Sequence, residues 1–237
     1  QKSVDSDRWQ YLDKVIYSKP TIGCIGLQPM QAVNIIEKIL RGLAALHERG
    51  IVHGDIKPSN IMLDCNGSIR LVDVGSAYAY ESQPQHPPEF LEDGKWTPQS
   101  DLASLGYVLL ELLTGKADLG GPKISDDSVT QRNPKLDRAL LSAKRSLPQR
   151  LSNLLPANVR ACDRLMGLCK KLIDPDPARR FSSADEAMAS EECGTWRFRV
   201  DIIQGNLGVH EVSAIKHWIR DVKRFASRLG LCHWPSC

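Results

Sequence analysis

The strongest constraint on the fold lies in residues 51–75, where the chain reads IVHGDIKPSNIMLDCNGSIRLVDVG. Two short apolar runs flank residues 64–67, and an Asn-Gly pair between apolar runs is typical of a tight β-hairpin. A hairpin brings its two outer ends together. The sequence therefore predicts that Asn60 and Asp73 lie at the same end of a small hairpin, at a fixed separation.

Helical patterns surround this hairpin. Apolar residues recur at helical spacing over residues 29–49, with Pro29 suited to the first turn and Gly50 to the C-terminal cap. Residues 100–115 are apolar around most of the helix circumference, which predicts a buried helix with Ser100 or Asp101 as its N-cap. Further helices are expected at about 8–17, 135–146, 157–173 and 183–190, and residues 76–100 read as an exposed loop.

The composition is that of an ordinary globular protein, with 237 residues of which 42% are hydrophobic and 25% charged. A net charge of +3 gives no bulk electrostatic argument for binding nucleic acid or a membrane surface. The seven cysteines are scattered without a zinc-ligand pattern, so we expect reduced thiols and a cytoplasmic location. No apolar run is long enough to span a membrane, and because the chain begins with Gln1 we expect further sequence upstream.

Several motifs occur in the order that one enzyme family uses. Residues 53–60, HGDIKPSN, match H-x-D-x-K-P-x-N, and residues 73–75, DVG, match D-F-G. Residues 87–89, PPE, stand in the place of A-P-E, Asp101 with SLG at 104–106 matches the buried helix, and residues 176–180, DPARR, match a late arginine motif. Over roughly residues 9–190 the chain therefore resembles the C-terminal lobe of a eukaryotic-type (Hanks-type) serine/threonine protein kinase, a family with bacterial members.

The resemblance implies phosphoryl transfer from Mg-ATP to a serine or threonine hydroxyl of a protein substrate. Asp55 would accept or orient the hydroxyl proton, and Lys57 would neutralise charge on the transferring phosphate. Asn60 and Asp73 would hold Mg²⁺ on the ATP phosphates, because both offer hard oxygen ligands. Lys57, Asn60 and Asp73 together are the residues expected to bind the ATP and Mg²⁺ cofactors.

Five further residues are expected to support the site, again by the resemblance. His53 would pack and hydrogen-bond, and Gly75 completes the metal-binding motif. Glu89 and Arg180 would form a partly buried ion pair that ties the activation segment to the lobe. Asp101 would brace the catalytic loop from the buried helix.

The implied fold is mainly α, with a helical bundle and a small β-hairpin at the catalytic loop. Residues 1–190 would form this lobe without an N-terminal lobe, since nothing before Pro29 supplies a glycine-rich loop or an ATP-binding lysine. Residues 191–237 fall outside the resemblance and are expected to add a strand at 196–203 and an amphipathic, basic helix at 211–229. That helix either packs on its own domain or binds a regulatory partner.

Three functions remain open on the sequence alone. The favoured one is a protein kinase present here as a fragment without the N-terminal lobe, because its catalytic residues are intact. The second is an inactive kinase-like scaffold. The third is a small-molecule phosphotransferase of the aminoglycoside or choline kinase type, which shares H-G-D-x-x-x-x-N but not the Lys57-Pro58 pair.

Gly54 stands where the family usually has an arginine, which argues against switching by a phosphorylated activation loop.

Overall fold

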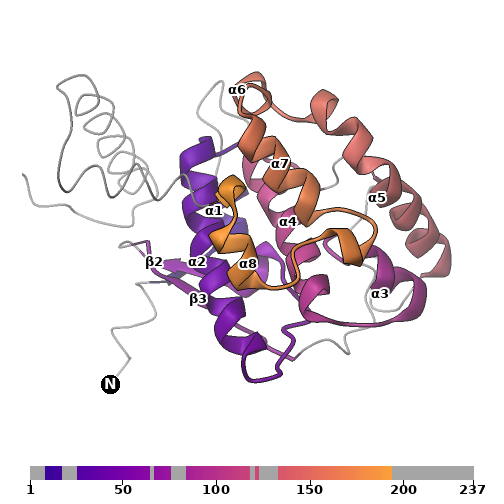
Figure 1. Cartoon of the computed structure of the whole chain (residues 1–237), viewed down its shortest axis with the longest axis horizontal. Coiled ribbons are helices and arrows are strands. Elements are labelled where there is room, and N and C mark those ends of the chain that lie inside the picture. The colour runs from indigo at the N-terminus through magenta and orange to yellow at the C-terminus, as the bar shows by residue number, and fades with distance from the viewer. Residues whose placement is uncertain are drawn as a thin grey trace, which may run out of the picture.

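The fold is organised around one buried helix. A computed structural model of the chain describes residues 9–17, 26–64, 67–75, 84–117, 121–122 and 133–193. Helix α4 (Pro98–Thr114) is buried from residue 100 to its end, with helix α2 (Pro29–His47) packed on one side and helix α7 (Asp163–Leu172) on another (Figure 1). The expectation of a mainly helical fold is confirmed, and so is the helix at 100–115 as a core element.

The start of α4 differs from the sequence prediction in a way that matters for the site. The N-cap is Thr97, whose Oγ1 accepts a hydrogen bond from the Ser100 backbone N–H at 3.2 Å, and Pro98 occupies the first turn. The prediction of Ser100 or Asp101 as the cap is therefore wrong by about one turn. Because Thr97 satisfies the helix end, the Asp101 side chain is left to bind elsewhere.

A small antiparallel sheet lies at one end of the helical bundle. Its strands are β1 (Trp9–Tyr11), β2 (Ile61–Asp64) and β3 (Ile69–Leu71), in the order β1-β2-β3. The predicted hairpin is confirmed as β2 and β3, with Leu63 opposite Ile69. The predicted helix at 8–17 is wrong over residues 9–11, because that segment pairs with the second edge of β2 before helix α1 (Leu12–Tyr17) begins.

The expected exposed loop at 76–100 is confirmed at residues 94–97 and wrong over residues 85–93 and 98–100, which are buried or helical. Helix α3 (Pro88–Asp93) follows a buried segment, and both Phe90 and Leu91 are buried. The Phe90 ring stacks on Trp96 with centroids 4.5 Å apart and meets the edge of His86 at the same distance. A helix this short shows no apolar period, so its burial is decided by packing against distant parts of the chain.

The last helices are α5 (Pro134–Leu154), α6 (Ala157–Arg160), α7 and α8 (Ala184–Ala189). Helix α5 is longer than the predicted helix at 135–146, because it continues through Pro148, where the buried side chains of Leu147 and Leu151 hold it against the core.

The helix predicted at 157–173 is two helices, α6 and α7. In one continuous helix Val159 would point about 120° away from the buried stripe of α7, and the break at Cys162 lets both pack inward.

Two sequence expectations lie outside the described residues: the strand at 196–203 and the basic helix at 211–229. Together they make up most of the expected 191–237 extension. Within the described part of the chain, no helix combines the length and the apolar character needed to cross a membrane.

Close packing of α4 against α7 leads to a first prediction. A Cβ added at Gly106 would lie 2.7 Å from Cγ2 of Ile173 and 2.8 Å from Cβ of Leu172, both in the core. We expect Gly106→Ala to lower the free energy of unfolding by about 1–3 kcal/mol, because the two helices must separate to admit the methyl group. Urea unfolding followed by circular dichroism measures the change.

Gly167→Ala is the matched control, because Gly167 lies in α7 but its added Cβ would meet only the flexible Glu192 side chain, at 3.2 Å. This variant should be neutral or stabilised by up to about 1 kcal/mol through better helix propensity. Equal destabilisation by the two substitutions would show that the close contact of Gly106 with α7 does not set the cost.

Candidate active site

The catalytic loop is attached to the core by one carboxylate. Asp101 of α4 is fully buried, and its two oxygens accept the backbone N–H groups of His53 at 2.8 Å and Gly54 at 2.9 Å. His47, at the end of α2, contributes a third contact through Nε2 at 2.9 Å from Oδ2. A buried carboxylate needs such donors, so the position of α4 fixes the backbone of the loop.

His53 and Gly54 shape the turn that precedes Asp55. The His53 side chain is fully buried, and burial lowers its pKa below the usual value, which keeps the imidazole neutral. Its Nδ1 accepts the Asp55 backbone N–H at 3.3 Å. Gly54 has a φ of 75°, a left-handed conformation that favours glycine over the family's arginine.

Three predicted site residues meet around the Asp55 carboxylate. Oδ2 lies 2.9 Å from Nζ of Lys57 and 2.7 Å from Nδ2 of Asn60. The same Nδ2 donates to the Asp55 backbone carbonyl at 2.9 Å, and a single turn of 3₁₀ helix, η2 (Pro58–Asn60), brings Asn60 back to this position. The carboxylate is thus held by a cation and an amide at the start of β2.

Asp73 lies in a segment that is tied to the catalytic loop on both sides. The Val72 backbone N–H donates to the Asn60 carbonyl at 3.0 Å, and the Gly75 N–H donates to the His53 carbonyl at 3.0 Å. Between them Asp73 is exposed and takes a left-handed backbone with a φ of 56°. Such a conformation is strained for a residue other than glycine and is found most often at functional sites.

The donor set of this site fits magnesium. Since Asn60 uses its amide nitrogen to hold Asp55, its carbonyl oxygen remains available to a cation, and Asp73 adds a carboxylate. No cluster of three or more His, Cys, Asp or Glu side chains with metal-binding geometry occurs among the described residues.

Glu89 and Arg180 form a two-pronged ion pair. Nη1 and Nη2 of Arg180 lie 2.7 and 2.8 Å from the two Glu89 oxygens, and Ser100 Oγ also donates to Glu89 at 2.8 Å. The remaining Arg180 donors bind the backbone carbonyls of Asp174 at 2.7 Å and Gln99 at 3.0 Å. Burial by itself would raise the pKa of Glu89, but the bonds and charge of Arg180 outweigh it and hold that pKa below its usual value.

Sequence reasoning missed the polar groups that hold the segment before α3. Ser104 of α4 donates to the Gln85 carbonyl at 2.9 Å, and the Gln85 amide donates to the buried Glu111 carboxylate at 2.9 Å. Tyr17 of α1 donates to the other Glu111 oxygen. Burial raises the pKa of Glu111 in spite of these two donors. A lone glutamate in an otherwise apolar helix was the available signal.

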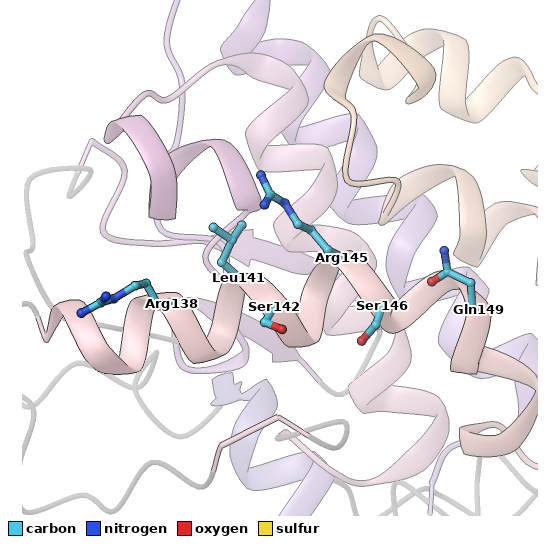
Figure 2. A pocket seen from close by; sticks show the side chains of 6 residues that line it. All are labelled: Arg138, Leu141, Ser142, Arg145, Ser146 and Gln149. Atoms are coloured by element: carbon cyan, nitrogen blue, oxygen red, sulfur yellow. The ribbon is translucent and has the colours of Figure 1, made fainter.

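A broad hollow lies elsewhere, on the outward face of α5. It has a volume of about 580 Å³ and is bordered by side chains of this one helix, Arg138, Leu141, Ser142, Arg145, Ser146 and Gln149 (Figure 2). Arg145 is already paired with Glu92 of α3. None of the predicted site residues borders this hollow, so the motif residues and not the hollow define the candidate site.

Comparison with known proteins identifies the family of the chain. The family described as "Protein kinase domain" matches residues 12–191. The serine/threonine-protein kinase PrkC of Bacillus subtilis is 33% identical over 178 residues, which are 69% of this chain and 25% of that protein. Drp72 of Corynebacterium efficiens is 33% identical over 65% of this chain, and the plant kinase AtPK2/AtPK19 of Arabidopsis thaliana is 31% identical over 62%.

The fold and the matches define the class of this protein. The chain belongs to the protein kinase family, and within it to the Hanks-type serine/threonine protein kinases, as its motifs predicted. It spans only 25–29% of the length of these three relatives.

The Glu89 and Arg180 pair leads to a stability prediction. We expect Arg180→Met to lower the free energy of unfolding by about 3–5 kcal/mol, because the partly buried Glu89 would lose its charged partner. Its neighbour Arg179 is 75% exposed, and Arg179→Met should change stability by no more than about 0.5 kcal/mol. Urea unfolding of both variants measures the difference, and similar losses would contradict a special role for the pair.

The lowered pKa of Glu89 predicts how stability depends on pH. The unfolded chain binds a proton at Glu89 at a higher pH than the folded chain does, so this stabilisation is present above pH about 4.5 and is lost as the pH falls below it. Glu89→Gln should therefore flatten the loss of unfolding free energy on acidification. Arg180→Met should flatten it as well, and an unchanged acid dependence in either variant would exclude Glu89 as its source.

Proposed function

We propose that this chain forms the C-terminal lobe of an ATP-dependent protein serine/threonine kinase. The observation that carries the proposal is the arrangement at Asp55, whose Oδ2 is held by Lys57 at 2.9 Å and Asn60 at 2.7 Å in a loop fastened to the buried helix. A carboxylate placed beside a cation is what transfer of a phosphoryl group to a hydroxyl requires, because the chemistry depends on positioning and charge neutralisation.

Each residue then has a role that its surroundings support. Asp55 accepts or orients the proton of the substrate hydroxyl, and Lys57, part of whose side chain is exposed, neutralises charge on the transferring phosphate. Asn60 and Asp73 would hold Mg²⁺, which would neutralise charge on the ATP phosphates when bound. His53, Gly75 and Asp101 keep these groups in register through the loop hydrogen bonds.

We further propose that these residues supply only one wall of the ATP site. The part of the chain that the structure describes holds one small sheet of three strands, and the sequence before Pro29 shows neither a glycine-rich loop nor a strand lysine of the kinase type. An N-terminal lobe from outside the 237 residues would complete the cleft, so we expect this chain alone to be inactive.

Three further parts of the proposal concern location, regulation and substrate class. A cytoplasmic location is in keeping with the free thiols of Cys162, Cys169 and Cys193. The basic helix expected at 211–229 is proposed to bind a regulatory partner. A small-molecule substrate is disfavoured, because the Glu89 and Arg180 pair, an element of the protein kinase motifs, is fully formed.

A transfer assay tests the proposal. Mg-ATP labelled at the γ-phosphate is supplied with a mixture of serine and threonine peptides, first to this chain and then to the complete protein that contains it. We expect no turnover by the chain and measurable transfer by the complete protein. Asp55→Asn in the complete protein should reduce transfer at least about 100-fold, because the hydroxyl proton loses its acceptor.

The matched control is Asp93→Asn, since Asp93 is an exposed aspartate whose ion-pair partner Lys95 is also exposed, and activity should be retained. Nucleotide binding by the complete protein without transfer, or no binding at all, would favour the scaffold function. Transfer to an aminoglycoside or to choline but to no peptide would favour a small-molecule phosphotransferase. Turnover by the isolated chain would show that a second lobe is dispensable.

A further inference from the structure

One face of helix α4 carries three buried polar side chains. Ser104 and Glu111 follow Asp101 along the helix so that all three lie within about 80° of one another around its axis. Each is no more than 2% exposed, and the positions between them are occupied by apolar side chains, glycine and tyrosine. A buried polar side chain is costly unless it is hydrogen-bonded, so the partners of these three show what this face of α4 holds in place.

The partners of this face are the catalytic loop and the segment before α3. Asp101 binds the backbone of the loop, and Ser104, about one turn further along the helix, donates to the Gln85 carbonyl at 2.9 Å. Glu111 accepts a hydrogen bond from the side-chain amide of the same Gln85, also at 2.9 Å. Gln85 is therefore fastened at both its carbonyl and its amide, along the face of α4 that holds the catalytic loop.

Glu111 also holds helix α1. Its other carboxylate oxygen accepts a hydrogen bond from the hydroxyl of Tyr17, the last residue of that helix. Helix α1 packs against the 3₁₀ turn η2, whose last residue Asn60 holds the carboxylate of Asp55. Because both hydrogen bonds end on one carboxylate, Glu111 fixes the separation between the end of α1 and Gln85.

The placement of these two elements matters because a substrate hydroxyl must reach Asp55. A general base acts only on a proton whose donor lies within about 2.6–3.2 Å. The substrate residues on either side of that hydroxyl must lie on the chain around the catalytic loop, where α1 packs on η2 and Gln85 is held about one helical turn from Asp101. A displacement of about 1 Å can reduce the rate of such a reaction about 100-fold.

We propose that Glu111 is a positioning residue for the protein substrate, acting through Tyr17 and Gln85. The inference rests on the proposed kinase function and extends it, because it names α1 and the segment before α3 as the two elements that hold the substrate peptide. The Asn60 and Asp73 side of the site is tied to the loop by backbone bonds that do not involve Glu111. Loss of Glu111 therefore weakens peptide binding and leaves Mg-ATP binding unchanged.

Hydrogen–deuterium exchange of the 237-residue chain tests the coupling without any kinase activity. We expect Tyr17→Phe to speed exchange of the amides between Gln85 and Gly94 about 2–10-fold, which corresponds to one lost hydrogen bond. Glu111→Leu removes two bonds and should speed the same amides at least about 10-fold. Unchanged exchange in both variants would overturn the coupling.

Thr114→Val is the matched control for the exchange measurement. Thr114 is buried on the same helix, and its hydroxyl donates to the Leu110 carbonyl of α4 itself at 2.7 Å. This substitution removes a buried hydrogen bond without touching Gln85 or Tyr17, so exchange between Gln85 and Gly94 should stay the same. An equal acceleration by Thr114→Val and Tyr17→Phe would show a general loosening of α4 and would contradict the inference.

Steady-state kinetics of the complete protein test the role in substrate positioning. Glu111→Leu should raise KM for a peptide at least about 10-fold and KM for Mg-ATP less than about twofold. Gln85→Glu places two carboxyl groups against each other and should also raise the peptide KM. Combining Gln85→Glu with Glu111→Gln should restore it, because the new carboxylate accepts from the new amide, whose oxygen still accepts from Tyr17.

The kinetic outcomes separate this inference from the proposed function. Failure of the combined variant to recover, or an equal rise in the KM values for peptide and Mg-ATP in Glu111→Leu, would overturn the role of Glu111 while leaving the kinase function in place. Absence of any transfer by the unmodified complete protein would overturn the kinase function and the substrate role together.

Discussion

The site depends on one buried carboxylate, that of Asp101. Helix α4 is enclosed by the rest of the lobe, and a charge buried there is tolerable only if donors surround it. The backbone N–H groups of His53 and Gly54 are those donors. Through them the core determines where the catalytic loop runs. Two further backbone bonds, Val72 to Asn60 and Gly75 to His53, extend this control to the segment that carries Asp73.

A second set of buried polar contacts holds the segment that leads into α3. Pro84 and Gln85 are bound through their carbonyls by Lys144 of α5 and Ser104 of α4, and Glu89 is bound by Arg180. These contacts come from the folded lobe itself and need no phosphate.

Much of this architecture was predictable, and the failures share a cause. The helices at 29–49 and 100–115 and the hairpin after Asn60 were correct because each has a local signal, either a helical apolar period or an Asn-Gly turn. Short α3 has no such period, and the break between α6 and α7 depends on where Val159 meets the core. The strand at Trp9–Tyr11 exists because β2 offers it an edge.

The sequence by itself determined the chemistry: which side chains are present in residues 53–75, and the spacing that places them on one loop and one hairpin. Only the tertiary structure decided which buried charges find partners. Glu111 and Tyr17 are 94 positions apart in the chain, and Lys144 is 60 positions from Pro84. Such contacts have no local signature, because burial and the need to satisfy polar groups act on whichever residues the fold brings together. Glu111 and Lys144 acquire their importance only in that way.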